Sequence, residues 1–96
     1  MSFIVEWQDR DGTILERAIL PIRELVPFDD TSYPYLRLVD PYSKTVFSSY
    51  QMIGVLPELE HLQDVQAGKE EGLVEITRMA QRCREEPHSV LVFHGD

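Results

Sequence analysis

The chain has 96 residues, enough for one compact domain with a single hydrophobic core and too few for two. A hydrophobic share of 43% and a charged share of 27% argue against disorder, and the longest apolar runs are far shorter than a membrane span. Seventeen acidic and nine basic residues give a net charge of −8, which disfavours nucleic acid and anionic membranes and favours a basic protein partner.

Two further features bear on the compartment. Residues 1–6 lack the basic region and apolar stretch of a signal peptide. Cys83 is the only cysteine, so an internal disulfide is excluded and a reducing environment is favoured. We therefore expect a single domain over residues 1–96, located in the cytoplasm.

The N-terminal third predicts two strands joined by a tight turn. Apolar residues alternate with more polar ones over residues 3–8, which is the period of a strand. Residues 9–12 end in a glycine that can close a hairpin, and residues 13–19 are rich in Ile and Leu, as in a second strand. Residues 21–25 predict a short helical turn that begins with proline, and residues 27–34 a loop.

The middle of the chain predicts a second pair of strands followed by a helix start. Residues 35–39 and 44–47 are the predicted strands, and residues 40–43 form a turn in which proline sets the backbone angle of the second position. Ser48, followed three residues later by Gln51, has the pattern of a capping box at the beginning of a helix.

The C-terminal half predicts two helices. Pro57 is expected to kink or interrupt the first helix because it cannot donate a backbone hydrogen bond. The second helix is predicted over residues 69–85. The apolar stripes of the two helices consist of Met52, Val55, Leu56, Leu59 and Leu62 in the first, and of Leu73, Ile76, Met79, Ala80 and Cys83 in the second.

The last segment, residues 89–93, is almost continuously apolar, as expected for a strand buried on both faces at the centre of a sheet. Together these elements predict an α+β fold, in which an antiparallel sheet of four or five strands has two helices packed on one face.

The residue types that usually carry chemistry are dispersed. His61, His88 and His94 share no metal-ligand spacing with one another or with Cys83, which lies on an apolar helix stripe. We therefore predict no metal, no cofactor and no catalytic residue, and expect a protein that is not an enzyme. The alternative is a small enzyme or ligand-binding domain whose site brings at least two of these four residues together with a carboxylate.

One loop has the composition of a protein-binding surface. Asp29 and Asp30 lie among aromatic residues, with Tyr33 and Tyr35 close by in the sequence, and Tyr42 stands at the tip of the next turn. We predict that these five residues contact a protein partner. The competing interpretation is that the aromatic side chains turn inward over the edge of the sheet.

The segment LRLVDPYSKTVF, residues 36–47, together with Pro87-His88 and the terminal Gly95-Asp96, resembles a group of small bacterial proteins of uncharacterised function. In that group an Asp-Pro-Tyr turn precedes Thr-x-Phe, and the chain ends in Pro-His, an apolar strand and Gly-Asp. Ser43, Lys44 and Ser48 differ from the Gly, Asp and Asn of that pattern. The resemblance implies a bacterial single-domain protein and no particular activity.

The leading functional hypothesis is a small acidic interaction protein that covers a basic protein partner, as immunity proteins and antitoxins do. A self-associating scaffold or accessory subunit is the third alternative, with Phe3–Gln8 as an edge strand that pairs in a homodimer.

Overall fold

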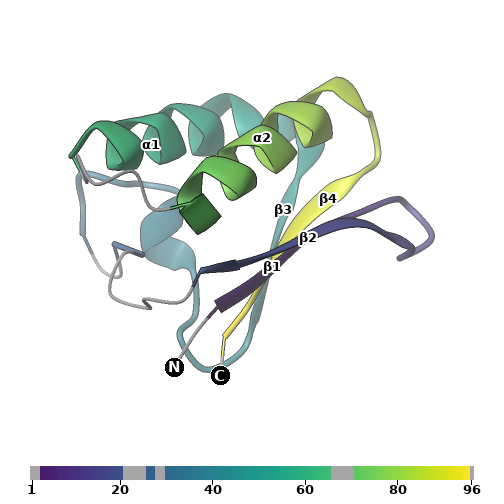
Figure 1. The fold of residues 1–96 in the computed structure, drawn as a ribbon, viewed down its shortest axis with the longest axis horizontal. Coiled ribbons are helices and arrows are strands. Elements are labelled where there is room, and N and C mark those ends of the chain that lie inside the picture. The colour runs from purple at the N-terminus through teal and green to yellow at the C-terminus, as the bar shows by residue number, and fades with distance from the viewer. Residues whose placement is uncertain (1–2, 21–25, 28–29, 66–70, 96) are drawn as a thin grey trace.

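The computed structural model describes residues 3–20, 26–27, 30–65 and 71–95 of the chain. These residues form a four-stranded antiparallel sheet with two helices on one face, which confirms the predicted α+β class (Figure 1). The strands are β1 (Phe3–Gln8), β2 (Ile14–Leu20), β3 (Lys44–Ser48) and β4 (Val90–His94), in the spatial order β2-β1-β4-β3. The helices are α1 (Met52–Val65) and α2 (Glu71–Glu85).

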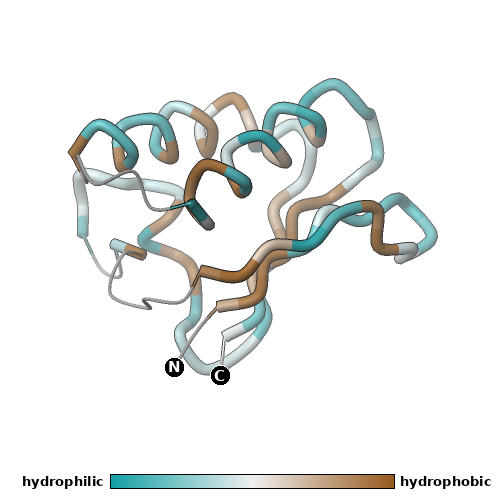
Figure 2. Tube along the Cα trace, viewed as in Figure 1, coloured by the Kyte–Doolittle hydropathy of each residue, from teal (hydrophilic) through white to brown (hydrophobic). Residues whose placement is uncertain are grey.

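The alternation predicted for the first strand places Phe3, Val5 and Trp7 against the helices, where they join a single hydrophobic core. The predicted helix stripes are buried in the same core. Figure 2 shows hydrophobic stretches along the strands, while the connection from α2 to β4 is mainly hydrophilic. No described helix is long and apolar enough to cross a membrane.

The prediction of a central, doubly buried C-terminal strand is confirmed. β4 lies between β1 and β3, and Leu91, Val92 and Phe93 are each at most 2% exposed. Leu91 and Phe93 belong to the hydrophobic core, whereas Val92 lies on the other side of the sheet. We call that side, which no described helix covers, the open face.

The predicted strand over residues 35–39 is wrong, because Leu36–Leu38 form a 3₁₀-helix, η2. The carboxylate of Glu58, on α1, accepts hydrogen bonds from the backbone N–H groups of Tyr35 at 3.0 Å and Leu36 at 2.8 Å. A strand would direct such donors to a neighbouring strand. Because its donors bond to Glu58, this segment lies against the first helix and is not part of the sheet, which has four strands.

The predicted helix start is confirmed and the predicted interruption is wrong. Ser48 and Gln51 form both bonds of a capping box around the short 3₁₀-helix η3 (Ser49–Gln51). Helix α1 then runs unbroken through Pro57. The proline lacks only its own N–H, so the one helix bond lost is the bond that the Ile53 carbonyl would accept.

Some of the other predictions fall outside the described residues, and one more is wrong. The second helix begins at Glu71 in the described residues, whereas its predicted residues 69–70 and the predicted helical turn over residues 21–25 lie outside them. The suggestion that Phe3–Gln8 is an edge strand is wrong, since β1 pairs with both β2 and β4.

Two of the quoted sequence motifs, the Asp40-Pro41-Tyr42 turn and the C-terminal motif that contains Gly95, meet in space. The Asp40 carboxylate accepts hydrogen bonds from the Tyr42 N–H and the Ser43 hydroxyl, both at 2.8 Å, and these bonds hold the pKa of Asp40 below its usual value. The Gly95 N–H donates to the Ser43 carbonyl at 2.8 Å, and a Cβ on Gly95 would lie 2.5 Å from the Asp40 carbonyl oxygen. Both motifs thus fix the connection into β3 against the chain end.

Candidate functional site

The predicted binding loop does not present its residues on one surface. Asp29 lies outside the described residues, and the exposed Asp30 accepts a hydrogen bond from the Ser32 N–H. Tyr33 is only 7% exposed and belongs to the core, and Tyr35 packs half-buried against it.

Tyr35 lies directly over Gly54 of α1, where a Cβ would come within 2.0 Å of the ring, so the glycine makes room for the tyrosine. Tyr42 is 73% exposed on a different turn. The structure therefore leaves Asp30 and Tyr42, on separate turns, as the described surface members of this set.

The residues of the enzyme alternative are also separated. The His61 ring lies 5.6 Å from the Tyr33 ring, His88 follows α2, and His94 lies on the open face. Cys83 is fully buried between α2 and the sheet, and its burial raises the pKa of the thiol. Within the described ranges, no group of three or more His, Cys, Asp or Glu side chains could hold a metal ion.

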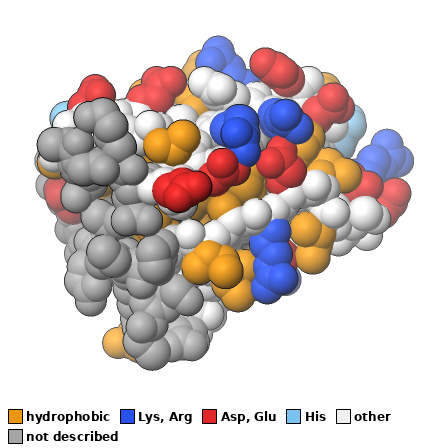
Figure 3. Space-filling view, viewed as in Figure 1, with side chains coloured by type: hydrophobic (Ala, Val, Ile, Leu, Met, Phe, Trp, Pro, Cys, Tyr) orange, Lys and Arg blue, Asp and Glu red, His pale blue; other side chains and the backbone are white. Residues whose placement is uncertain are grey.

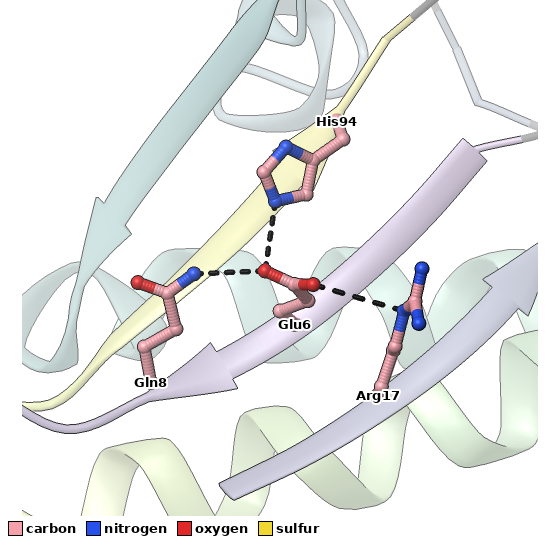
Figure 4. A network of polar contacts seen from close by, with 4 residues as sticks. All are labelled: Glu6, Gln8, Arg17 and His94. Atoms are coloured by element: carbon pink, nitrogen blue, oxygen red, sulfur yellow. Dashed lines mark hydrogen bonds and ion pairs between the residues drawn. The ribbon is translucent and has the colours of Figure 1, made fainter. Parts of the chain in front are cut away.

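A polar network occupies the centre of the open face (Figure 4). The Glu6 side chain, on the second strand from the edge, is only 10% exposed. Its Oε1 accepts a hydrogen bond from Gln8 Nε2 at 2.8 Å and lies 2.9 Å from His94 Nε2, while Oε2 lies 3.7 Å from Arg17 Nε. The network links β1 to both neighbouring strands, and each of its members already has a partner within it. We therefore infer that the network fixes the register of the strands.

The Glu6 network predicts a pH dependence of stability. Burial raises the pKa of the Glu6 carboxyl, but hydrogen bonds from His94 and Gln8 and the charges of His94 and Arg17 outweigh it and leave the pKa lowered. A lowered pKa stabilises the fold above the ordinary value of about 4.5, and this contribution is lost as the pH falls through the folded-state pKa.

We therefore expect Glu6→Gln to have a lower free energy of unfolding than the wild type at about pH 6. This gap in unfolding free energy should narrow toward about pH 3. Urea denaturation across this range measures the gap, and Glu60→Gln, at an exposed position on α1, is the matched control. A gap that stays constant with pH would contradict the assignment.

Two connections meet at the end of the sheet where β1 leaves it, and we call residues 9–13 and 86–89 the turn end. In the first connection, Asp9 Oδ1 accepts hydrogen bonds from the N–H groups of Asp11 and Thr13, both at 2.9 Å. Gly12 adopts a φ of 87°, which favours glycine. The β1–β2 turn is therefore held in one conformation by its own residues.

The second connection, from α2 to β4, is held as firmly. The Ser89 hydroxyl lies 2.7 Å from the Glu86 carbonyl oxygen and 3.2 Å from that of Cys83. His88 has a φ of 73°, an uncommon conformation for a residue other than glycine, and such strain is concentrated at functional sites. The two connections form rigid walls.

A hollow of about 390 Å³ lies between these walls, with Trp7 among the residues that line it. We call it the Trp7 hollow. Trp7 is 8% exposed, and its Nε1–H has no hydrogen-bond partner among the described residues. The other lining residues are Asp9, Arg10, Asp11, Leu15, Glu86, Pro87 and Ser89.

A β-bulge explains why Leu15 reaches the hollow. The register between β1 and β2 pairs Trp7 with Glu16 and Gln8 with Ile14, which leaves Leu15 as the extra residue. Bulges redirect side chains near the ends of strands. Leu15, 44% exposed, thus joins Trp7 and Pro87 as an apolar part of the lining.

The charged part of the lining is mainly acidic. Elsewhere on the molecule acidic and basic side chains are interspersed, as Figure 3 shows for the face in view, and Glu16 pairs with Arg82 at 3.1 Å. In the described part of the chain, by contrast, neither Asp11 nor Glu86 has an ion-pair partner. Arg10 is the one basic residue among the lining residues.

A second hollow, of about 510 Å³, adjoins the turn end on the open face. Val46, Val90 and Val92 contribute its apolar surface, and His88 and Tyr50, the latter 74% exposed, also line it. The residues that it shares with the turn end are Asp9, Arg10, Gly12, His88 and Ser89. Its charged lining residues are Asp9, Arg10 and Lys44, so the second hollow, unlike the Trp7 hollow, has no acidic excess.

Sequence reasoning missed the Trp7 hollow because its residues come from segments about 80 positions apart. Trp7 lies opposite Leu91 in the β1–β4 pairing, and only that pairing brings residues 86–89 beside residues 9–11. The prediction of a central C-terminal strand was the one available signal. A central strand has a neighbour on each side, so the connection that leads into it must lie beside the end of a neighbouring strand.

Comparison of the chain with protein-family models, with curated proteins and with solved structures gives no match.

Proposed function

We propose that this protein is a non-enzymatic interaction domain that binds a basic protein partner at its turn end. The observation that carries the proposal is the Trp7 hollow, in which an aromatic side chain, apolar side chains and carboxylates without an ion-pair partner among the described residues lie between two hydrogen-bonded connections. Buried aromatic anchors surrounded by polar rims are typical of protein interfaces. Rigid walls also reduce the ordering cost of binding.

The charge of the molecule supports the choice of a basic partner. A net charge of −8 accelerates the encounter with a positively charged protein and disfavours acidic competitors. Occupation of the turn end would cover a basic surface of the partner by steric occlusion, which is how an immunity protein or antitoxin acts. The lone buried Cys83 is compatible with such a role in the reducing cytoplasm.

The test is capture of the partner from the cells that make the protein, followed by measurement with the purified pair. We expect a basic protein to be retained at low salt and released as salt screens the charges. The double variant Asp11→Lys/Glu86→Lys should weaken the purified complex more than tenfold in isothermal calorimetry, because it reverses the charge of two carboxylates that line the hollow.

The matched control is Glu60→Lys/Asp64→Lys, which reverses two exposed carboxylates on α1 and changes the net charge equally. If wild type and both variants bind the partner alike, the turn end is not the interface. If no protein is retained at low salt, the proposed function is wrong.

A further inference from the structure

We infer that two copies of this chain pair through their β3 strands, antiparallel to each other and related by a two-fold axis at Val46, so that the two sheets become one. This inference goes beyond the proposed function, since it concerns another surface and another occupant. β3 is one of the two outer strands of the sheet. No other described helix or strand runs along its outer side.

The hydrogen bonds at the two ends of β3 show which of its backbone groups point away from β4. The Gly95 N–H donates to the Ser43 carbonyl at 2.8 Å, and the Ser49 N–H donates to the Ser89 carbonyl at 3.2 Å. Hydrogen-bonded residues alternate along an antiparallel strand, and the register between these two bonds is continuous. The residues that direct both N–H and C=O outward are therefore Lys44, Val46 and Ser48.

Most of these outward groups are available to another chain. The Ser48 N–H donates to Gln51 Oε1 at 2.7 Å in the capping box, which ends the open part of the edge. In the described part of the chain, no hydrogen bond involves the outward backbone groups of Lys44 or Val46. Such groups on an edge strand readily pair with a strand of another molecule.

The other edge of the sheet is less suited to this pairing. β2 contains the bulge at Leu15, and bulges twist an edge strand away from a straight partner. The start of α2 also lies against that edge, since a Cβ on Gly72 would be 2.4 Å from the Ile19 carbonyl oxygen. β3 has neither obstacle, because its register with β4 is continuous and no described helix runs along its outer side.

The segment around β3 is almost free of charge, which favours a second copy over a charged partner. Residues 41–57 contain one charged side chain, that of Lys44, although 27% of the whole chain is charged. The centres of protein interfaces are likewise depleted in charged residues and enriched in tyrosine. Tyr42 and Tyr50, which flank β3, are 73% and 74% exposed, and Val46 is 48% exposed.

An axis at Val46 matches the side chains of the two copies. The two valines then lie opposite each other, and Lys44 of each copy lies opposite Ser48 of the other, so no like charges are opposed. The same register directs Tyr50 of one copy toward Tyr42 of the other, because both positions are equally distant from the axis. A contact of this symmetry uses the same surface twice and closes at two copies.

Analytical ultracentrifugation of the full chain measures the association. We expect a monomer–dimer equilibrium with a dissociation constant of about 100 µM, because small interfaces are weak. Each copy has a net charge of −8, so the dimer should tighten as salt rises from about 20 mM to about 300 mM and screens the repulsion. The complex with a basic partner should weaken over the same range, which distinguishes the two associations.

Hydrogen exchange tests whether the contact is a strand pairing. The Val46 N–H points outward and is expected to exchange rapidly in the monomer. In the dimer it donates across the axis, so its exchange should slow as the protein concentration rises.

Variants at position 46 test the position of the axis. Val46→Lys and Val46→Glu each place like charges opposite each other and should weaken the dimer more than about tenfold, whereas a mixture of the two should associate. Val46→Pro should keep the fold and abolish the dimer, because proline is tolerated where an edge-strand N–H faces outward. The control Ile19→Lys, exposed on β2, should leave the dissociation constant within about twofold of the wild-type value.

A chain that stays monomeric up to about 1 mM at the higher salt concentration would overturn the inference. It would also be wrong if folded Val46→Lys dimerised as the wild type does, or if the mixture of charged variants failed to associate. Val46→Glu that dimerises alone would place the axis elsewhere and would equally contradict it. None of these outcomes affects the basic partner, whose binding is measured at the turn end.

Discussion

Replacing Glu58 with alanine is expected to lower the free energy of unfolding by about 3 kcal/mol. The Glu58 side chain accepts hydrogen bonds from the backbone N–H groups of Tyr35 and Leu36, and Leu36 is only 1% exposed. Alanine would leave these donors buried with no acceptor, and hydrogen bonds to a charged acceptor are stronger than average. Urea denaturation followed by circular dichroism measures the loss.

Two matched variants separate this effect from a general effect of charge. Glu58→Gln keeps an acceptor oxygen and should cost less than Glu58→Ala, whereas Glu60→Ala, exposed on the same helix, should stay within about 0.5 kcal/mol of the wild type. If Glu58→Ala also stayed within that range, the 3₁₀ conformation of Leu36–Leu38 would need another cause.

Those parts of the fold that depend on local patterns were predictable from the sequence. The alternation over Phe3–Gln8, the capping box at Ser48 and the apolar stripe of α2 each have a period or spacing that belongs to one kind of element. The near-continuous apolar run of β4 likewise implied a central position, and the sheet order confirms it.

Those parts that depend on distant partners were not predictable. Residues 35–39 have the composition of a strand, yet Glu58, more than 20 positions away, takes the backbone donors that a neighbouring strand would need. Leu15 belongs to a bulge that no period in the sequence reveals. The Trp7 hollow exists only because β1 and β4 pair, so no single stretch of the chain contains its pattern.

The Glu6 network and the Trp7 hollow both depend on one strand. β4 carries Leu91 and Phe93 into the core, and on its opposite face it carries Val92 and His94. Its first residues also continue from the connection that forms one wall of the Trp7 hollow. The packing of β4 against the helices should therefore determine how firmly the turn end is held, even though no core side chain of β4 lines that hollow.

The largest loss of stability in this strand is expected for Phe93→Ala, about 4 kcal/mol. Phe93 is 2% exposed, and its ring meets that of Phe47 edge-on, with centroids 5.8 Å apart and an interplanar angle of 89°. Removing the ring loses the free energy gained by burying it and leaves a cavity in the core. Val46→Ala, half-exposed on the neighbouring strand, is the control and should cost less than about 1 kcal/mol.

A double-mutant cycle with Phe47→Leu and Phe93→Leu isolates the contact between the rings, since leucine retains most of the apolar volume at each position. We expect an interaction energy of about 1 kcal/mol, typical of an edge-on aromatic pair. A value near zero would mean that the two rings stabilise β3 and β4 through burial alone. A loss below about 2 kcal/mol for Phe93→Ala would mean that the core closes over the gap, and β4 would then not be the element on which the turn end depends.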